Sequence, residues 1–287
     1  SSLVNSVFGE TNQSEFNTRH YTDSLLFIKG GHIASGSQAD VYSALNPSTG
    51  QLLAVKEINL INMPSKDMLN IKTEIELAFE LDHPNIIKYY GVKYSPSFDK
   101  VFILMEYTAF GSIQTLINTF GPLPEKVIML YLADIAEGIK YLHANRIVHR
   151  DLKCSNILLS SENRCKLIDF GISTREGGSH ESSLCLQGTP FWMAPECISS
   201  EKEITTKADL WSLGACILEM ATGKVPFNHI ADNPWSFAFH LSQIKSEDQL
   251  TLVSDQDRDK LSQRLSNIVQ GLIKINPESR VLNYDRY

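Results

Sequence analysis

The sequence is poor in the features that mark membrane, secreted or nucleic-acid-binding proteins. No apolar run approaches the roughly 20 residues of a membrane-spanning helix, and the first residues lack the charged and apolar regions of a signal peptide. Lys and Arg number 26 against 33 Asp and Glu, a net charge of −7, which argues against a nucleic-acid or acidic-membrane surface. The five cysteines form no C-x-x-C pair, which favours reduced thiols over a disulfide or zinc framework.

What remains is the composition of an ordinary folded protein. The chain has 287 residues, of which 43% are hydrophobic and 21% charged, as in average globular domains. At roughly 150 residues per domain, this length predicts about two lobes or domains. It is also enough to bury a core without disulfides or a structural metal. The first residue is Ser1 rather than Met, so we expect a fragment or a processed chain.

The first part of the chain is predicted to be rich in strands. Residues 1–24 are polar and without clear period, and we expect a flexible arm or an added strand there. Residues 25–107 contain short apolar runs, such as residues 25–28 and 86–90, separated by Gly- and Pro-rich breaks. One helix is predicted over about residues 65–81, because its apolar side chains repeat every three or four residues.

The second part of the chain is predicted to be mainly helical. Apolar residues at helical spacing predict helices over about residues 124–145, 207–222 and 255–275. A β-rich part followed by an α-rich part is an α+β pattern. The expected fold class is therefore α+β with two lobes, a β-rich N-lobe over residues 25–107 and a mainly helical C-lobe over residues 108–287.

Two short strings carry the chemistry. Residues 149–156 read HRDLKCSN, and residues 169–171 read DFG. They bring three oxygen-bearing side chains, those of Asp151, Asn156 and Asp169, to the ends of short apolar runs. Mg²⁺ takes oxygen ligands of this kind and usually shares them with substrate phosphates. A lone Asp in a loop is more often a turn residue, but the two strings occur together.

This combination resembles the protein kinase family, whose signatures include both strings. The resemblance covers about residues 25–280. It implies a bilobal kinase fold and transfer of the γ-phosphoryl group of ATP, with Mg²⁺, to a protein hydroxyl. Asp151 is implied to orient that hydroxyl and accept its proton, and Lys153 to steady the transferred phosphoryl group. Asn156 and Asp169 are the implied Mg²⁺ ligands.

The resemblance also assigns residues of the N-lobe. Lys56, in the string LAVK, is implied to position the ATP phosphates. Its implied partner is Glu74 on the predicted regulatory helix, with Glu76 and Glu80 as alternatives. Ala78 stands where the family usually has a larger apolar residue. We therefore expect a helix that is easily displaced, so that activity depends on activation-loop phosphorylation or on a partner.

The nucleotide site is implied in the same way. Its residues are Ala34, Gly36, Val41, Ala54, Lys56, Met105, Glu106, Thr108 and Leu158. Met105 is the implied gatekeeper, and the backbone of Glu106 and Thr108 is implied to pair with adenine. The glycine-rich loop departs from the family pattern, since residues 34–41, ASGSQADV, keep only the middle glycine. Alanine restricts positive φ, so we expect a stiffer loop or a raised KM for ATP.

The activation segment ends in residues 188–196, GTPFWMAPE, which resembles the family's substrate-docking segment. The candidate phosphosites of the segment are Ser179, Ser182, Ser183 and Thr189, of which Ser182 or Ser183 is favoured, and an unmodified loop is the alternative. Arg150 is implied to bind the loop phosphate. Three further residues are implied to be structural: Glu196 and Arg280 as a buried ion pair, and Asp209 as a brace for the catalytic-loop backbone. After Arg280 the chain is short, so we expect the last helix to be truncated.

A few positions indicate which kind of protein kinase the chain resembles. Lys153 and Thr189 are features of Ser/Thr kinases, and several strings look most like MAP kinase kinase kinases, with sterile-20-like kinases second. This resemblance implies a protein substrate, for which a downstream MAP kinase kinase is a candidate, an upstream activator or scaffold, and a cytoplasmic location. The alternatives are a pseudokinase acting as an allosteric or scaffolding module, because of the weak glycine-rich loop, and a small-molecule kinase.

Overall fold

The computed structural model divides the chain into two compact units, Ser1–Ala109 and Phe110–Tyr287. The boundary expected from the sequence lies two residues earlier, between Tyr107 and Thr108. The described residues are 26–36, 39–95, 97, 99–170, 173–175, 189–198 and 204–283, apart from the side chains of residues 66, 70, 73, 74, 174 and 175. The expected N-terminal extension, residues 1–24, lies outside the described residues, as do Ser179, Ser182 and Ser183.

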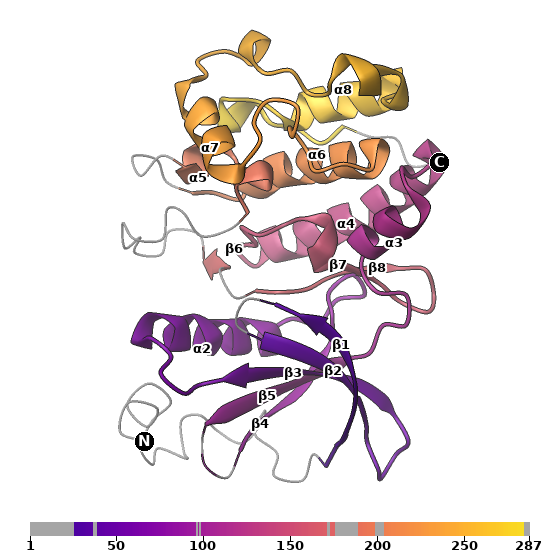
Figure 1. Ribbon diagram of the computed structural model, residues 1–287, viewed down its shortest axis with the longest axis vertical. Helices are drawn as coiled ribbons and strands as arrows, with labels where there is room; N and C mark the ends of the chain where they lie inside the picture. The colour runs from indigo at the N-terminus through magenta and orange to yellow at the C-terminus, as the bar shows by residue number, and fades with distance from the viewer. Residues whose placement is uncertain are drawn as a thin grey trace. The chain divides into compact units, whose positions relative to one another are not determined.

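In the described residues of the first unit, a five-stranded antiparallel sheet is accompanied by the helix α2 (Figure 1). The strands are β1 (Ile28–Ser35), β2 (Ala39–Leu45), β3 (Leu52–Asn59), β4 (Tyr89–Tyr94) and β5 (Lys100–Glu106), in the order β1-β2-β3-β5-β4. The helix α2 (Ser65–Glu80) contacts β4 and buries Met68, Ile71 and Ile75. The apolar period of the sequence therefore marks the face of α2 that packs on the unit's core.

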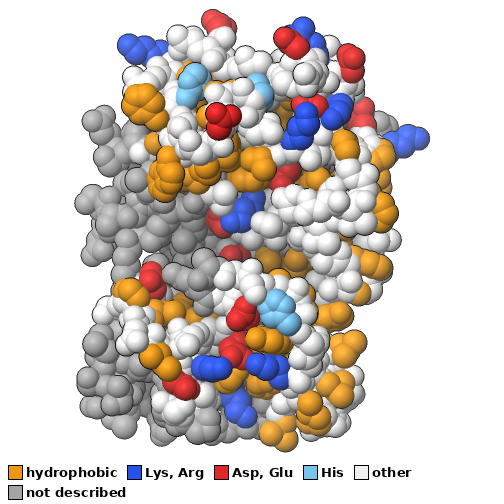
Figure 2. Space-filling view, in the orientation of Figure 1, with side chains coloured by type: hydrophobic (Ala, Val, Ile, Leu, Met, Phe, Trp, Pro, Cys, Tyr) orange, Lys and Arg blue, Asp and Glu red, His pale blue; other side chains and the backbone are white. Residues whose placement is uncertain are grey.

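The sheet of the first unit has a buried centre and an exposed edge. Val55 on β3 and Leu104 on β5 are both 0% exposed, whereas β1 is exposed along its whole length. Charged side chains of opposite sign lie together on the face seen in Figure 2. In the first unit, for example, Lys29 and Lys100 both bind Glu57, at 2.6 and 2.7 Å. The charges of both lysines are thus paired with the carboxylate of Glu57.

The second unit is mainly helical. Its helices are α3 (Ile113–Phe120), α4 (Glu125–Ala144), α5 (Pro195–Ile198), α6 (Lys207–Thr222), α7 (Pro234–Gln243) and α8 (Gln263–Leu272). Its short strands form two pairs, β6 (Ile147–Val148) with β9 (Thr174–Arg175) and β7 (Ile157–Leu159) with β8 (Cys165–Leu167). Helix α6 is buried along most of its length and contacts both α4 and α8 (Figure 1). It is therefore the central element of this unit.

Several predicted boundaries need correction. The helix expected over residues 255–275 is two elements, a 3₁₀ turn (Asp255–Lys260) followed by α8. Ser262 separates them, because its hydroxyl accepts the backbone N–H of Leu265 at 3.2 Å and caps α8. The strands expected at residues 25–28 and 86–90 begin later, at Ile28 and Tyr89. The second begins late because Ile86 donates its N–H to the carbonyl of His83, which closes a turn.

The expected fold class is confirmed by the β-rich first unit and the helical second unit. Over the described residues, no helix combines the length and apolar character needed to span a membrane.

Candidate active site

Residues 149–156, which the resemblance implies to be the catalytic loop, are held by Asp209 on α6. The two oxygens of its carboxylate accept the backbone N–H groups of His149 and Arg150, each at 2.9 Å. The ring of His143 lies 2.8 Å from the same carboxylate. Arg150 has a φ of 69°, which for a non-glycine residue costs about 1–3 kcal/mol and persists only where the surroundings impose it. The carboxylate of Asp209 is one such constraint.

Asp209 is also electrostatically adapted to its position, where it is 0% exposed. Burial alone would raise its pKa, but the hydrogen bond and charge of His143 outweigh that effect, helped by the charge of His149 and the N–H of Arg150. The pKa of Asp209 is therefore lowered. The carboxylate stays ionised and remains an acceptor for the loop.

Three side chains meet in front of this loop. The Lys153 ammonium group lies 2.8 Å from the Asp151 carboxylate and donates to the Thr189 hydroxyl, also at 2.8 Å. The Thr189 hydroxyl in turn donates to the other oxygen of Asp151 at 3.2 Å. The Asp151 carboxylate, which can accept a proton, is thus fixed beside the Lys153 ammonium group, which can balance a negative charge. Thr189, a phosphosite candidate from the sequence, lies within this network.

Asn156 is bound to the same loop. Its side-chain amide nitrogen donates to the backbone carbonyl of Asp151 at 2.9 Å and to the Asp151 carboxylate at 3.0 Å. Both amide hydrogens are used in this way, so the orientation of the amide is fixed. Its oxygen is left as an acceptor, which is the atom that a hard cation takes.

The DFG segment is held by the catalytic loop through His149. The Nε2 of His149 donates to the carbonyl of Ile168 at 3.0 Å, and its ring lies 5.4 Å from that of Phe170, which is fully buried. The N–H of Ile168 donates to the carbonyl of Asn156 at 3.1 Å. Asp169 itself has a φ of 69°. The structure therefore brings the loop residues and the backbone of the DFG segment together.

Glu196 and Arg280 form the buried pair that the sequence analysis expected. Arg280 donates from both terminal nitrogens to the two carboxylate oxygens, with Nη2–Oε2 at 2.7 Å, and both side chains are almost completely buried. Arg280 also donates to the carbonyls of Lys207 and Lys274. A two-pronged, fully bonded geometry of this kind is what a buried ion pair needs.

Glu219 on α6 was missed from the sequence. It accepts the indole N–H of Trp192 at 2.9 Å, and so fixes the docking segment to α6. Ser212 adds a bond to the carbonyl of Trp192 at 2.8 Å. The sequence did contain a signal for Glu219, because the helix of residues 207–222 is apolar on nearly every side and must therefore be buried. A carboxylate on such a helix needs a partner.

Several of the expected nucleotide-site residues lie on strands of the first unit. Lys56 on β3 is opposite Val41 on β2, and Ala54 on β3 is opposite Met105 on β5. Glu106 ends β5, and its N–H donates to the carbonyl of Lys88 at 2.8 Å. Thr108 follows β5, and Leu158 lies on β7 of the second unit. Glu74 lies on α2, and its side chain is outside the described residues.

The glycine-rich loop is described at residues 34–36 and 39–41. Gly36 follows β1 and donates its N–H to the carbonyl of Ala39 at 2.7 Å. Ala34 pairs with Val41 across β1 and β2. Neither Ala34 nor Ala39 has a positive φ in the described loop. These two positions therefore do not require the positive φ that alanine disfavours, and the raised KM for ATP stays a prediction.

Comparison with known proteins identifies the family of the chain. The family model described as protein kinase domain matches residues 27–283. The chain therefore belongs to the protein kinase domain family.

Its relatives include proteins named as kinases. The chain is 41% identical to mitogen-activated protein kinase kinase kinase A of Dictyostelium discoideum, covering 73% of this chain and 22% of the relative. It is 33% identical to the serine/threonine-protein kinase BCK1/SLK1/SSP31 of Saccharomyces cerevisiae, covering 92% and 18%. It is 40% identical to cytokinesis protein sepH of Aspergillus niger, covering 72% and 15%. The chain thus spans less than a quarter of the length of each of these relatives.

Proposed function

We propose that the protein transfers the γ-phosphoryl group of ATP to Ser or Thr hydroxyls of a protein substrate. The observation that carries this proposal is the contact of Asp151 with Lys153 and Thr189. Phosphoryl transfer needs positioning and charge neutralisation more than covalent chemistry. An oriented acid beside a cation meets that need, and the family shown by the comparison performs this reaction.

Each loop residue has a defined task in this proposal. Asp151 holds the substrate hydroxyl and accepts its proton. Lys153, bonded to the same carboxylate, balances negative charge on the transferred group. Thr189 keeps the Lys153 ammonium group and the Asp151 carboxylate in one geometry. Lys56, paired with Glu74, positions the ATP phosphates.

The donor set fits a magnesium ion. Asn156 offers an amide oxygen whose orientation is fixed by Asp151, and Asp169 offers a carboxylate. Both are the hard oxygen ligands that Mg²⁺ prefers. When bound, the ion supplies positive charge against the phosphates. The protein's part is to hold these two oxygens in place.

The substrate proposed is a MAP kinase kinase. The support is the similarity to mitogen-activated protein kinase kinase kinase A of Dictyostelium discoideum; the yeast relative, Lys153 and Thr189 support Ser/Thr specificity. A second candidate is a substrate in the control of cytokinesis, because sepH is similar at 40% identity. Ser182 and Ser183 are the proposed activating phosphosites, with Arg150 as the phosphate receiver and an upstream kinase or scaffold as activator.

Thr189 is proposed as a positioning residue rather than an activating phosphosite. Its hydroxyl already contacts both Lys153 and Asp151. A phosphate there would place negative charge beside the Asp151 carboxylate and compete for Lys153.

The test is phosphate transfer from Mg·ATP to an inactive MAP kinase kinase and to a generic Ser/Thr substrate. Asp151→Asn should lower the rate about 10²–10⁴-fold, the range for a lost general base. Asp259→Asn, an exposed carboxylate, is the matched control and should leave the rate unchanged. Equal rates for wild type and Asp151→Asn would contradict the proposal. A sample without activity that also gains no thermal stability from Mg·ATP would instead indicate a pseudokinase.

A further inference from the structure

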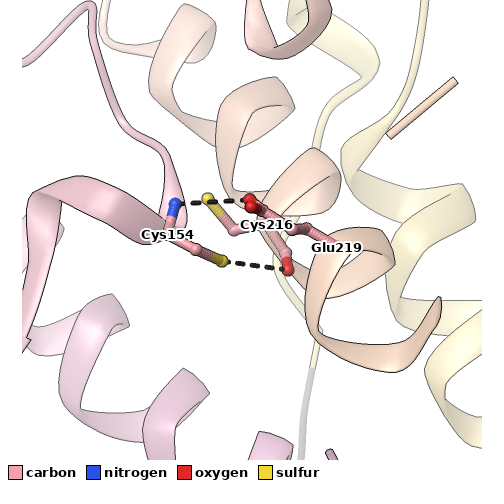
Figure 3. Close-up of side chains that lie close together, drawn as sticks. All are labelled: Cys154, Cys216 and Glu219. Carbon is pink, nitrogen blue, oxygen red and sulfur yellow. Dashed lines mark hydrogen bonds between the residues drawn. The ribbon is translucent and has the colours of Figure 1, made fainter. Parts of the chain in front are cut away.

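Two cysteines and one glutamate gather behind the catalytic loop (Figure 3). Cys154 opens the 3₁₀ turn Cys154–Asn156, and Cys216 and Glu219 lie three residues apart on α6, which places them on one side of the helix. One ligand atom from each residue lies within 4.8 Å of the others. The Cys154 thiol points to the backbone carbonyl of Cys216 at 3.7 Å.

The cluster is buried and holds an oxygen atom without a hydrogen-bond partner among the described residues. Cys154 and Cys216 are both 0% exposed, and Glu219 is 1% exposed. The Oε2 of Glu219 accepts N–H groups from Trp192, at 2.9 Å, and Cys154, at 3.4 Å. Its Oε1 is buried and has no hydrogen-bond partner in the described part of the chain. Leaving a buried acceptor in this state is unfavourable, so a ligand that binds Oε1 would remove a cost.

The donor set selects the kind of ligand. Two sulfurs and one carboxylate oxygen suit a borderline-soft cation such as Zn²⁺, whereas Mg²⁺ and Ca²⁺ prefer oxygen alone. Zn–S bonds of about 2.3 Å place two sulfurs about 3.8 Å apart in tetrahedral geometry. Ligand atoms already within 4.8 Å of one another need to close by only about 1 Å to reach this arrangement.

We propose that Cys154, Cys216 and Glu219 bind one zinc-like cation between the catalytic loop and α6. Three protein ligands leave one tetrahedral position open. Two thiolates and a carboxylate would give the occupied site a net charge of −1, and the charge of Lys153 acts on both Cys216 and Glu219. This site is distinct from the oxygen donors Asn156 and Asp169.

Two properties of the site follow from burial. Both thiols are buried, and because the ligating form of cysteine is the thiolate, an ion must displace their protons to bind, which only thiophilic cations do readily. Because all three side chains are enclosed, entry requires the Cys154–Asn156 turn to open, and binding should be slow. Samples are therefore equilibrated with the ion for hours before measurement.

The experiment uses Cd²⁺ as a spectroscopic probe of the full chain. Cys185, which lies outside the described residues, is replaced by Ser in every sample, and no nucleotide is added. Binding is followed by the thiolate-to-cadmium charge-transfer absorption and by the rise in Tm. We expect a band that saturates at one equivalent. Zn²⁺ should displace the Cd²⁺, and excess Mg²⁺ should not.

The variants assign the band to its ligands. Cys216→Ala and Cys154→Ala should each abolish the band, and Glu219→Gln should weaken binding more than about tenfold, since even outer-shell partners contribute that much. The matched controls are Cys165→Ala and Cys197→Ala, which remove thiols that are also buried but belong to no group of three potential ligands in the described chain. Both controls should keep the band.

The result that would overturn the proposal is the absence of a saturable band in the folded wild type, as expected if Oε1 of Glu219 carries a proton instead. A band that persists in Cys216→Ala would overturn it equally. Circular dichroism of each metal-free variant shows whether it folds, and Glu219→Gln tests the site if an alanine variant does not. None of these readouts requires kinase activity, so failure of the proposed function would leave them interpretable.

Discussion

The carboxylate of Asp209 orients three hydrogen-bond donors at once: two backbone N–H groups and the ring of His143. It is the residue on which the geometry of the catalytic loop depends most directly. The loop backbone at Arg150 has a positive φ, so it will relax if its acceptor is removed. Catalysis and local stability should therefore change together at this position.

Asp209→Asn tests this dependence. An amide has one acceptor oxygen, so one backbone N–H would face an NH₂ group and lose its partner. We expect a loss of about 1–3 kcal/mol of stability and a reduced kcat, measured by urea unfolding and by phosphate transfer. Asp259→Asn is again the exposed control. Wild-type stability and kcat in Asp209→Asn would show that the loop does not need this acceptor.

The sequence predicted the residues of this site better than their contacts. Asp151, Asn156 and Asp169 stand out because the two strings that contain them are specific. The orientation of Asn156 by Asp151, and the fixing of Trp192 by Glu219, depend on segments far apart in the chain. Such contacts follow from tertiary packing, which single-chain spacing does not encode.

At the scale of elements, the ion pair of Glu196 and Arg280 joins α5 to the chain after α8. Arg280→Leu would leave the Glu196 carboxylate buried without its cation, and we expect a loss of about 3–5 kcal/mol. Arg280→Lys keeps the charge but loses the two-pronged geometry, and should cost less. Denaturant midpoints by circular dichroism measure both variants.

A double-mutant cycle gives the decisive comparison. Adding Glu196→Leu to Arg280→Leu removes the orphaned charge, so the double variant should lose less stability than the two single losses added together. Additive losses would show that the two side chains are not coupled.

The end of α6 offers a test of backbone strain. Gly223 caps this helix with a φ of 72°, and a Cβ there would lie 3.0 Å from Cδ of Pro122. Gly223→Ala should cost about 1–2 kcal/mol for the left-handed conformation, plus the cost of moving Pro122. Gly50 has the same φ of 72°, but a Cβ added there would have no atom within 4 Å. Gly50→Ala should therefore cost less, and equal losses in thermal unfolding would contradict the role of Pro122.

Element boundaries show where periodicity is sufficient. Helices α2, α4 and α6 lie close to their predicted ranges, because each has a regular apolar face. The predicted helix of residues 255–275 is divided instead. Asp257 accepts hydrogen bonds from Lys224, Lys260 and Ser254, and these bonds hold a separate 3₁₀ turn. An apolar period cannot reveal a turn that is fixed by polar side chains.

At the scale of the whole molecule, the carboxylates determine how stability depends on pH. The pKa of Asp257 is lowered, chiefly by hydrogen bonds from Lys224 and Lys260, and that of Asp209 is lowered as well. A carboxyl group whose pKa is lower in the folded than in the unfolded protein stabilises the fold at any pH above its unfolded pKa, which is about 4. That stability is lost as the pH falls. We expect Tm to fall steeply below about pH 4, measured by calorimetry.

Two variants separate the contributions of Asp257 and Glu219 to the pH dependence of stability. Asp257→Asn should be less stable than wild type at pH 7 but lose less on acidification. Glu219 has the opposite sign, because burial raises its pKa. Its contribution is complete below the unfolded pKa and is lost as the pH rises through the folded value. Metal-free Glu219→Gln should therefore gain stability relative to wild type as the pH rises, and no change in that difference would contradict the assignment.

The pairing of Glu196 with Arg280 has a consequence for the nascent chain. The two residues are 84 positions apart, so at about 5–20 residues per second a ribosome needs about 4–17 s to add the arginine after the glutamate. During that interval, burying the Glu196 carboxylate of α5 would leave its negative charge without a partner. The second unit should therefore reach its final state only after Arg280 is synthesised. A message terminated before this codon would yield a substrate for proteolysis rather than a smaller domain.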